Sequence, residues 1–89
     1  MIPIKECPVI YTIPSCHYCD KVKELFKIIE QPYMQIIVGR DLTKSQFQDL
    51  HPNAVGFPHV IIEGEEIGGL QNTAKYLVDK GYGDKLRQR

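Results

Sequence analysis

Two short apolar segments separated by an amphipathic stretch constrain the fold of this chain more than any other feature of its sequence. Residues 9–13 (VIYTI) are β-branched or aromatic and are bounded by Pro8 and Pro14, which is typical of a buried strand. Residues 33–38 (YMQIIV) form a second apolar segment, which Gly39 closes. Two strands joined through a helix lie parallel and are connected by a right-handed crossover. The first half of the chain therefore predicts a β-α-β unit.

The stretch between these segments has the pattern of a helix that packs on one side of a sheet. Apolar residues recur at positions i, i+3, i+4 and i+7, and charged residues occupy the remaining positions. Ser15 is expected to cap the N-terminus of this helix, and Pro32 is expected to end it. The residues of the apolar face are Val22, Leu25, Phe26 and Ile29.

The second half of the chain predicts a short helix, a hairpin and a last helix. Thr43 and Gln46 match a capping box at the start of the short helix. Residues 60–67 contain two apolar segments around an EGE turn, which suggests a hairpin. Residues 70–78 carry apolar side chains at helical spacing, and Gly81 is expected to end this helix. The order β-α-β-α-β-β-α predicts an α/β fold, with a mixed four-stranded sheet flanked by three helices.

Size and composition predict a single globular domain over residues 1–89, which we expect to be monomeric. Residues 83–89 are polar, so we expect them to be frayed or to form a short helical extension. The 11 basic and 11 acidic side chains cancel, which argues against a dedicated binder of nucleic acid or of a membrane surface. No apolar run approaches the roughly 20 residues that cross a bilayer. The first nine residues do not resemble a signal peptide.

Cys16 and Cys19 form a C-x-x-C pair at the expected junction between the first strand and the first helix. Three cysteines are too few, and odd in number, for a secreted disulfide scaffold, so we expect a reducing, cytoplasmic compartment. Unpaired N–H groups and the helix dipole stabilise a thiolate at such a position. Cys19, one turn further along, can close a disulfide and should be more buried. This asymmetry predicts that Cys16 attacks a disulfide and that Cys19 resolves the intermediate.

A structural zinc site is the main alternative interpretation of the pair Cys16 and Cys19. Such sites use four ligands, and one C-x-x-C supplies only two of them. His51 and His59 are eight positions apart, outside the usual spacing of a histidine pair. Cys7 lies roughly 20 Å from Cys16 along the first strand, and we expect it to be a semi-buried small hydrophobe. A purely structural disulfide across so small a loop would contribute little stability. We therefore expect no metal site.

Four features together resemble the glutaredoxins, small members of the thioredoxin fold. The sequence CHYC (16–19) is close to the family's C-P-Y-C, and GFPHV (56–60) stands where the family has Thr-Val-Pro before its third strand. The sequence IGGLQNTAKYL (67–77) matches the glycine pair and helix of the glutathione site, and the element order agrees. Residues 16–36 are particularly similar to dithiol glutaredoxins of bacteriophages, which supply electrons to ribonucleotide reductase. The resemblance implies a glutathione-dependent thiol-disulfide oxidoreductase that acts on proteins or small molecules, in the host cytoplasm if phage-encoded.

The resemblance also implies a substrate groove. Pro58 is expected to be cis and to pack against the cysteine pair, while the backbone of Phe57 pairs with the cysteine of glutathione. Backbone N–H groups of Gln71 and Asn72, just after Gly69, are expected to hold the γ-glutamyl carboxylate, because a helix N-terminus attracts anions. His17 adds positive charge beside the nucleophile if it is protonated, and an exposed neutral imidazole is the alternative. The residues expected to line the active-site groove are His17, Tyr18, Phe57 and Pro58.

Several positions depart from the family pattern. The family usually has lysine where this chain has Ile13, and often has arginine where it has Val55. It usually places acidic residues after the glycine pair, where this chain has Gln71 and Asn72. These differences remove charges that hold the glycine carboxylate and the amino group of glutathione. Arg40 is expected to be a solvated surface residue rather than a replacement. We therefore expect glutathione binding that is weaker or shifted.

Three other functions stay open at this point. A redoxin reduced by thioredoxin reductase, a flavoprotein, would not need the missing cations. A non-catalytic carrier would hold a metal or iron–sulfur centre through Cys16. Family members that bind such clusters usually have one active-site cysteine, so Cys19 counts against this reading. The third is a binding module of the same fold with silent cysteines.

Overall fold

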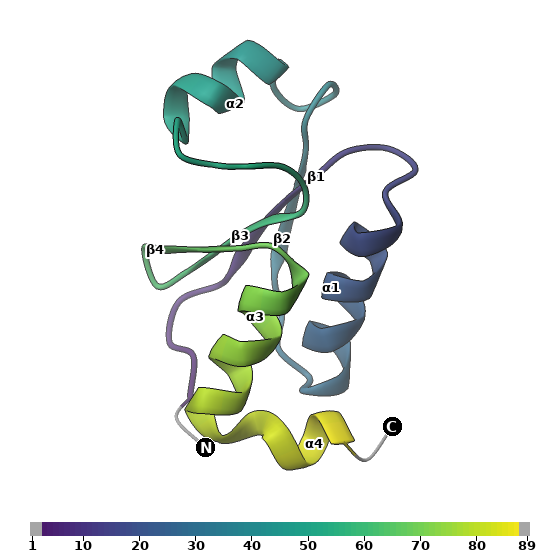
Figure 1. Ribbon diagram of the computed structural model, residues 1–89, viewed down its shortest axis with the longest axis vertical. Helices are drawn as coiled ribbons and strands as arrows, with labels where there is room; N and C mark the ends of the chain where they lie inside the picture. The colour runs from purple at the N-terminus through teal and green to yellow at the C-terminus, as the bar shows by residue number, and fades with distance from the viewer. Residues whose placement is uncertain (1–2, 88–89) are drawn as a thin grey trace.

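The computed structural model describes residues 3–87 and contains one mixed sheet of four strands (Figure 1). The strands lie in the order β2-β1-β3-β4. β1 pairs in parallel with β2, whereas β3 pairs antiparallel with both β1 and β4. The mixed four-stranded sheet predicted from the sequence is therefore confirmed. The strands are β1 (Val9–Thr12), β2 (Met34–Ile37), β3 (His59–Ile62) and β4 (Glu65–Gly68).

Three helices connect or follow the strands, as predicted. They are α1 (His17–Ile28), α2 (Lys44–Leu50) and α3 (Leu70–Leu77). After α3 the chain continues through a π-helical turn, η1 (Val78–Tyr82), into the short helix α4 (Gly83–Arg87). Gly81 has a φ of 97°, which breaks the helix at the predicted stop. Residues 83–87 thus form the short helical extension, while 88 and 89 lie outside the described residues.

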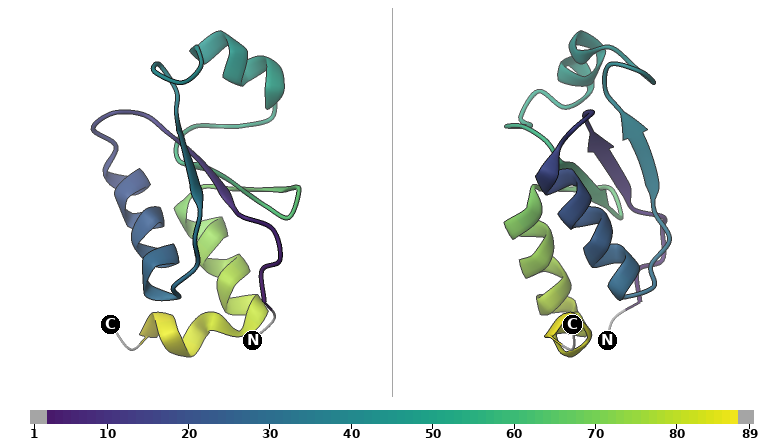
Figure 2. Two further views of the ribbon diagram at one scale, coloured as in Figure 1. Left: turned by 180° about the vertical axis from the view of Figure 1, so that it is seen from behind. Right: turned by 90° about the vertical axis from the view of Figure 1, so that its right-hand side faces the viewer.

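Alternate residues of the central strands point to opposite faces of the sheet and build two cores. Figure 2 shows α1 and α3 side by side on one face, and Figure 1 shows α2 at the opposite end of the molecule from α4. Strand residues such as Ile10 and Ile62 pack with α1 and α3, whereas Tyr11 packs with Phe47 of α2. The larger core consists of Ile10, Val22, Phe26, Ile29, Val60, Ile62, Leu77 and Tyr82. The smaller core consists of Tyr11, Val38 and Phe47.

The two predicted helix starts have different outcomes. The N-cap of α1 is Cys16 rather than Ser15, and the Cys19 N–H donates to the Cys16 sulfur at 3.2 Å. Ser15 has a φ of 58°, because the chain turns tightly there before the helix begins. The capping box of α2 is confirmed. The Thr43 hydroxyl accepts from the Gln46 N–H at 3.0 Å, and the Gln46 side chain accepts from the Thr43 N–H at 2.8 Å.

Two expectations about the first strand need correction. β1 ends at Thr12, so Ile13 lies beyond the strand with 38% of its surface exposed. Cys7 is exposed rather than semi-buried, because it precedes the first paired residue, Val9. Within residues 3–87, none of the helices has the length and apolar character that crossing a membrane requires.

Candidate functional site

The chain leaves β1 and enters the first turn of α1 with Cys16 and Cys19 on that turn. Their sulfur atoms are joined in a disulfide, and their Cα atoms are 5.2 Å apart. This separation lies inside the ordinary range for disulfides. Three positions on a helix are one turn apart, so the two sulfurs meet without any rearrangement of the backbone. The pair can therefore alternate between dithiol and disulfide on one rigid turn.

The two sulfurs of this pair differ in exposure and in polar surroundings. Cys16 is partly exposed, whereas only 2% of Cys19 is exposed. The Cys19 N–H that caps the helix points to the Cys16 sulfur, and this donor stabilises negative charge on that sulfur after reduction. The predicted difference in exposure is thus present, and an incoming substrate meets Cys16 first. The roles of attacking and resolving thiol stay predictions.

The segment before β3 and the start of α3 form a groove of about 370 Å³ next to the cysteine turn. The peptide bond between Phe57 and Pro58 is cis, as the family resemblance implied. Gly69 lies so close that a Cβ atom at this position would be 3.7 Å from the carbonyl oxygen of Pro58. The cis-proline segment and the start of α3 thus form adjacent walls. The groove is lined by Tyr18, Phe57, Pro58, Gly69, Leu70, Gln71 and Asn72.

The groove brings together six of the residues that the sequence singled out, although neither cysteine is among its lining residues. Tyr18, which is 60% exposed, connects the groove to the cysteine turn because it lies between Cys16 and Cys19. His17 does not line the groove; it is exposed, with its ring centroid 5.9 Å from that of Tyr18. Leu70 was missed, although its place between two predicted contact residues is a signal that could have found it.

The first turn of α3 supplies backbone donors at this groove. Gly69 is the N-cap and has no side chain to accept a hydrogen bond, and the Thr73 N–H donates to the Gly69 carbonyl at 3.0 Å. The N–H groups of the preceding residues, 70–72, are those that a helix leaves without an intrahelical acceptor. Such donors, together with the helix dipole, attract an anion. The predicted site for a carboxylate therefore has suitable backbone geometry.

Gly68 allows the chain to enter this turn. Its φ is 109°, a conformation that other residues rarely adopt. A Cβ atom at this position would also lie 2.9 Å from the side-chain nitrogen of Asn72. The backbone conformation thus favours glycine here, whereas the Asn72 side chain could move aside for a larger residue.

Side-chain cations contribute little to the groove. Among the described residues that line it there is no lysine or arginine. Val55, where the family often has arginine, is fully exposed. Arg40 is a surface residue, as expected, and donates to Asp41 at 3.0 and 3.2 Å. This hydrogen bond, followed by one from the Ile37 N–H, lowers the pKa of Asp41.

A larger hollow of about 690 Å³ lies between α1 and the C-terminal helix α4. Its lining is mostly charged and includes Lys23, Glu24 and Lys85. The cysteine pair and the residues predicted for the groove do not line it. The smaller groove is therefore the better candidate for the functional site.

Comparison with protein families matches residues 9–67 to a model described as Glutaredoxin. Among curated relatives, human mitochondrial glutaredoxin-2 is 34% identical over 73 residues, covering 76% of this chain and 43% of that protein. The hybrid peroxiredoxin hyPrx5 of Haemophilus influenzae is 32% identical over 74 residues, covering 83% of this chain and 30% of that protein. The chain therefore spans less than half the length of these relatives.

Solved structures agree with the predicted thioredoxin-like fold. The glutaredoxin of Brucella melitensis is 25% identical with a TM-score of 0.66, covering 94% of this chain and 90% of that chain. A buckwheat glutaredoxin–glutathione complex is 24% identical with a TM-score of 0.69, covering 91% of this chain and 76% of that chain. The predicted fold class is thereby confirmed.

Proposed function

This chain belongs to the glutaredoxin family, and we propose that it is a dithiol glutaredoxin that reduces disulfides with glutathione as its reductant. One observation carries the proposal. A redox-capable pair, Cys16 and Cys19, lies on the first turn of α1, and Tyr18 between them lines a groove suited to a peptide-like thiol. Members of the family are generally thiol-disulfide oxidoreductases, which supports the same reaction class.

In the first half of the proposed reaction, the Cys16 thiolate attacks one sulfur of a substrate disulfide. A mixed disulfide forms, and the other substrate sulfur leaves as a thiolate that takes up a proton. The Cys19 thiol then loses its proton and attacks the Cys16 sulfur, which releases the second substrate thiol. Two electrons have passed to the substrate, and Cys16 and Cys19 are left as a disulfide.

Two molecules of glutathione complete the cycle. The first attacks the Cys16 sulfur, forms a mixed disulfide there and releases Cys19 as a thiol. The second attacks the glutathione sulfur of that mixed disulfide, which yields glutathione disulfide and the Cys16 thiolate. The exposure of Cys16 and the burial of Cys19 favour attack of the first glutathione at the Cys16 sulfur.

The groove supports a specific orientation for glutathione. Its γ-glutamyl carboxylate would lie at the backbone N–H groups of Gln71 and Asn72, and its cysteine would pair with the backbone of Phe57 beside Pro58. A buckwheat glutaredoxin of this fold forms a complex with glutathione. Because the groove lacks side-chain cations among its lining residues, the glycine end of glutathione is held weakly in this proposal.

The wider setting is part of the same proposal. The similarity of residues 16–36 to bacteriophage glutaredoxins favours a monomeric, cytoplasmic protein that donates electrons to disulfide-containing proteins such as ribonucleotide reductase. The second candidate function is a redoxin reduced by thioredoxin reductase. The uncharged side chains of Ile13, Val55, Gln71 and Asn72 favour this candidate.

Recycling rates should separate the two candidates. The measurement follows NADPH oxidation during reduction of a small disulfide, with either glutathione and glutathione reductase or thioredoxin reductase alone as the reducing system. We expect faster turnover with glutathione, because the groove next to the cysteine turn offers backbone donors for its carboxylate. Faster turnover with thioredoxin reductase would contradict the choice of glutathione and would support the second candidate.

Replacing Ile13 with lysine should improve the use of glutathione. Ile13 is 38% exposed just ahead of the cysteine turn, so a lysine there can reach solvent and attract the glycine carboxylate. An exposed ion pair contributes about 0.2–1 kcal/mol, so we expect the KM for glutathione to fall by a factor of about 1.4 to 5. Ile13→Gln is the matched control without charge. Equal KM values for the two variants would contradict this explanation, as would an effect that persists at high salt.

A further inference from the structure

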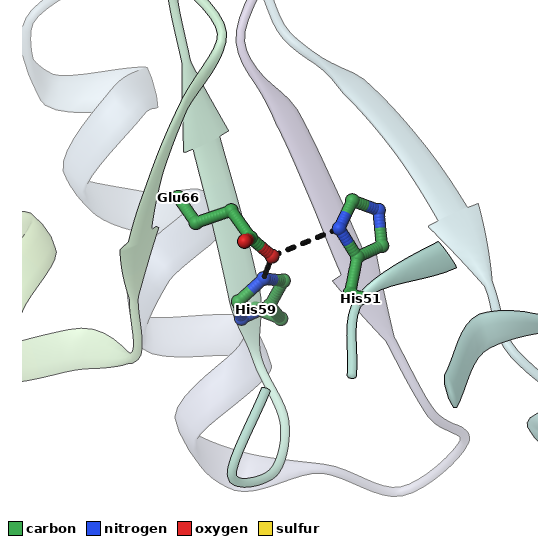
Figure 3. A group of neighbouring side chains, drawn as sticks. All are labelled: His51, His59 and Glu66. Atoms are coloured by element: carbon green, nitrogen blue, oxygen red, sulfur yellow. Dashed lines mark hydrogen bonds and ion pairs between the residues drawn. The ribbon is translucent and has the colours of Figure 1, made fainter. Parts of the chain in front are cut away.

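Three side chains from separate elements meet on the face of the sheet where Tyr11 packs against Phe47 of α2 (Figure 3). His51 is the C-cap of α2, His59 is the first residue of β3, and Glu66 belongs to β4. In the sheet register His59 pairs with Tyr11, and Glu66 pairs with Ile61. Because residues two apart on a strand share a face, His59 and Glu66 lie diagonally on the same face. The fold thus gathers residues that are distant in the sequence.

The potential ligand atoms of this cluster already converge. Figure 3 shows both rings pointing to one carboxylate oxygen. That oxygen, Oε1 of Glu66, lies 2.9 Å from Nδ1 of His51 and 2.9 Å from Nε2 of His59. A solvent-accessible glutamate carboxylate is charged at neutral pH, so Glu66 can bind a cation directly. All three ligand atoms lie within 4.8 Å of one another.

We propose that His51, His59 and Glu66 bind a divalent transition-metal ion of the zinc type, with the remaining position open to water. Two imidazole nitrogens and one carboxylate oxygen are a donor set that zinc accepts with a fourth, open position. Tetrahedral zinc with bonds of about 2.0–2.1 Å places its ligand atoms roughly 3.4 Å apart. The two nitrogen–oxygen separations would lengthen by about 0.5 Å to reach this geometry, and the two nitrogens, which lie within 4.8 Å of each other, would take up the same spacing. When the ion binds, the proton of each neutral imidazole moves to the other ring nitrogen, which leaves the lone pair of the nitrogen facing Glu66 for the ion.

Tyr11 supplies the outer contact that such a site requires. A histidine that binds a metal through one ring nitrogen usually donates its other N–H to a neighbouring oxygen. Nε2 of His51 lies 3.1 Å from the hydroxyl of Tyr11, which leaves Nδ1 for the ion. The Tyr11 ring is itself held in place, because it is 8% exposed and its centroid is 5.0 Å from that of Phe47. The orientation of His51 is therefore set before any ion arrives.

The three side chains of the cluster differ in their exposure to solvent, and this difference leaves a path for an ion. The side chain of His59 is 6% exposed and that of His51 15%, whereas the side chain of Glu66 is 39% exposed. An ion can approach along Glu66 and be held against the two less exposed rings. Phe47 is the buried residue of α2, so a metal at His51 would add a second attachment at the end of this helix. It would also brace β3 directly after Pro58.

The expectation of no metal site was based on the spacing of ligands within one short motif. His51 and His59 fail that spacing, but the criterion does not cover ligands drawn from a helix end and two strands. The cluster is separate from the redox pair, because α1 with Cys16 packs on the other face of the sheet. The proposed metal site can therefore be tested independently of the proposed redox function.

Calorimetric titration with zinc chloride tests this site. The protein should carry Cys7→Ser and keep the Cys16–Cys19 disulfide oxidised, because free thiolates also bind zinc. We expect one zinc ion per chain in this background. Glu66→Gln should weaken binding by at least about 100-fold, and Tyr11→Phe by about 10–100-fold, the usual effect of losing an outer contact.

The matched control for these variants is Glu65→Gln, because Glu65 pairs with Ile62 and belongs to the opposite face of the sheet. It should leave the affinity unchanged.

Two further readouts do not depend on the size of the affinity change. Zinc should raise the Tm of the background protein and of Glu65→Gln, but not that of Glu66→Gln. Cobalt chloride should give a spectrum of nitrogen and oxygen ligation without a thiolate charge-transfer band. Absence of saturable zinc binding, equal affinities for Glu66→Gln and Glu65→Gln, or a thiolate band with cobalt would each overturn the proposal. If Glu66→Gln does not fold, an affinity of Tyr11→Phe equal to that of the background would overturn it.

Discussion

Replacing Cys16 with serine is expected to reduce glutathione-coupled disulfide reduction to the rate measured without the protein. The thiolate is the nucleophile in thiol-disulfide exchange, and a serine hydroxyl neither ionises near neutral pH nor forms a mixed disulfide. The sulfur of Cys16 is the partly exposed member of the pair, so Cys19 at 2% exposure cannot take over its role. The measurement is NADPH oxidation with glutathione reductase and a small disulfide as substrate.

Two further cysteine variants make this prediction specific. Cys19→Ser should still attack the substrate but should accumulate a mixed disulfide at Cys16, which mass spectrometry of the non-reduced protein detects. Cys7→Ser is the matched control, because Cys7 is exposed and free and lies outside the groove. Its rate should equal that of the wild type. Residual activity in Cys16→Ser, with the mixed disulfide found on Cys19, would reverse the assigned roles. A wild type without activity would indicate a binding module with silent cysteines.

The elements that depend on local pattern could be predicted from the sequence. Apolar spacing found the face of α1, and the capping box located α2, because both signals lie within a few residues of each other. The cap of α1 was misplaced by one residue. A serine is the usual cap, but the tight turn after Pro14 puts Ser15 at a positive φ and leaves the cap to Cys16. Local preference was overridden by the direction in which the chain leaves β1.

The groove could be predicted only through resemblance to a family. Only about 5–6% of X-Pro bonds in folded proteins are cis, so sequence physics alone would have made Pro58 trans. The proximity of Phe57 and Pro58 to Gln71 and Asn72 depends on the packing of α3 beside β3, which no local pattern encodes. The family supplied both features, and the structure has both.

Neither local sequence patterns nor the family resemblance predicted the cluster of His51, His59 and Glu66. Its members are separated by up to 15 positions, and they meet because of the register between β3 and β4 and the position at which α2 ends. The register also shifts between Val60 and Ile61. A shift of one residue moves side chains to the other face, so the pattern of a hairpin does not by itself tell which face Glu66 occupies.

Replacing Phe26 with alanine is expected to destabilise the fold by about 3–5 kcal/mol, because it leaves a large cavity in the core. Phe26 is fully buried in the larger core, and its ring centroid is 5.8 Å from that of Tyr33. Domains of this kind have a free energy of unfolding of about 5–15 kcal/mol, and small ones lie near the lower end. Each kcal/mol lowers the Tm by about 4–8 °C at this size. Thermal unfolding followed by circular dichroism should therefore show a fall of at least about 12 °C, or no folded state.

Val55→Ala is the control for this experiment, because Val55 is fully exposed and its removal should change the free energy of unfolding by less than about 0.5 kcal/mol. A milder variant, Phe26→Leu, preserves most of the volume and should stay folded with a smaller loss. Because α1 contains Cys19 and has Cys16 as its N-cap, disulfide reduction by Phe26→Leu should decline with its folded fraction as temperature rises. A change below about 1 kcal/mol in Phe26→Ala would show that the core face of α1 does not hold this helix. The turn that carries Cys16 and Cys19 would then be held in position by β1 and the residues of the groove alone.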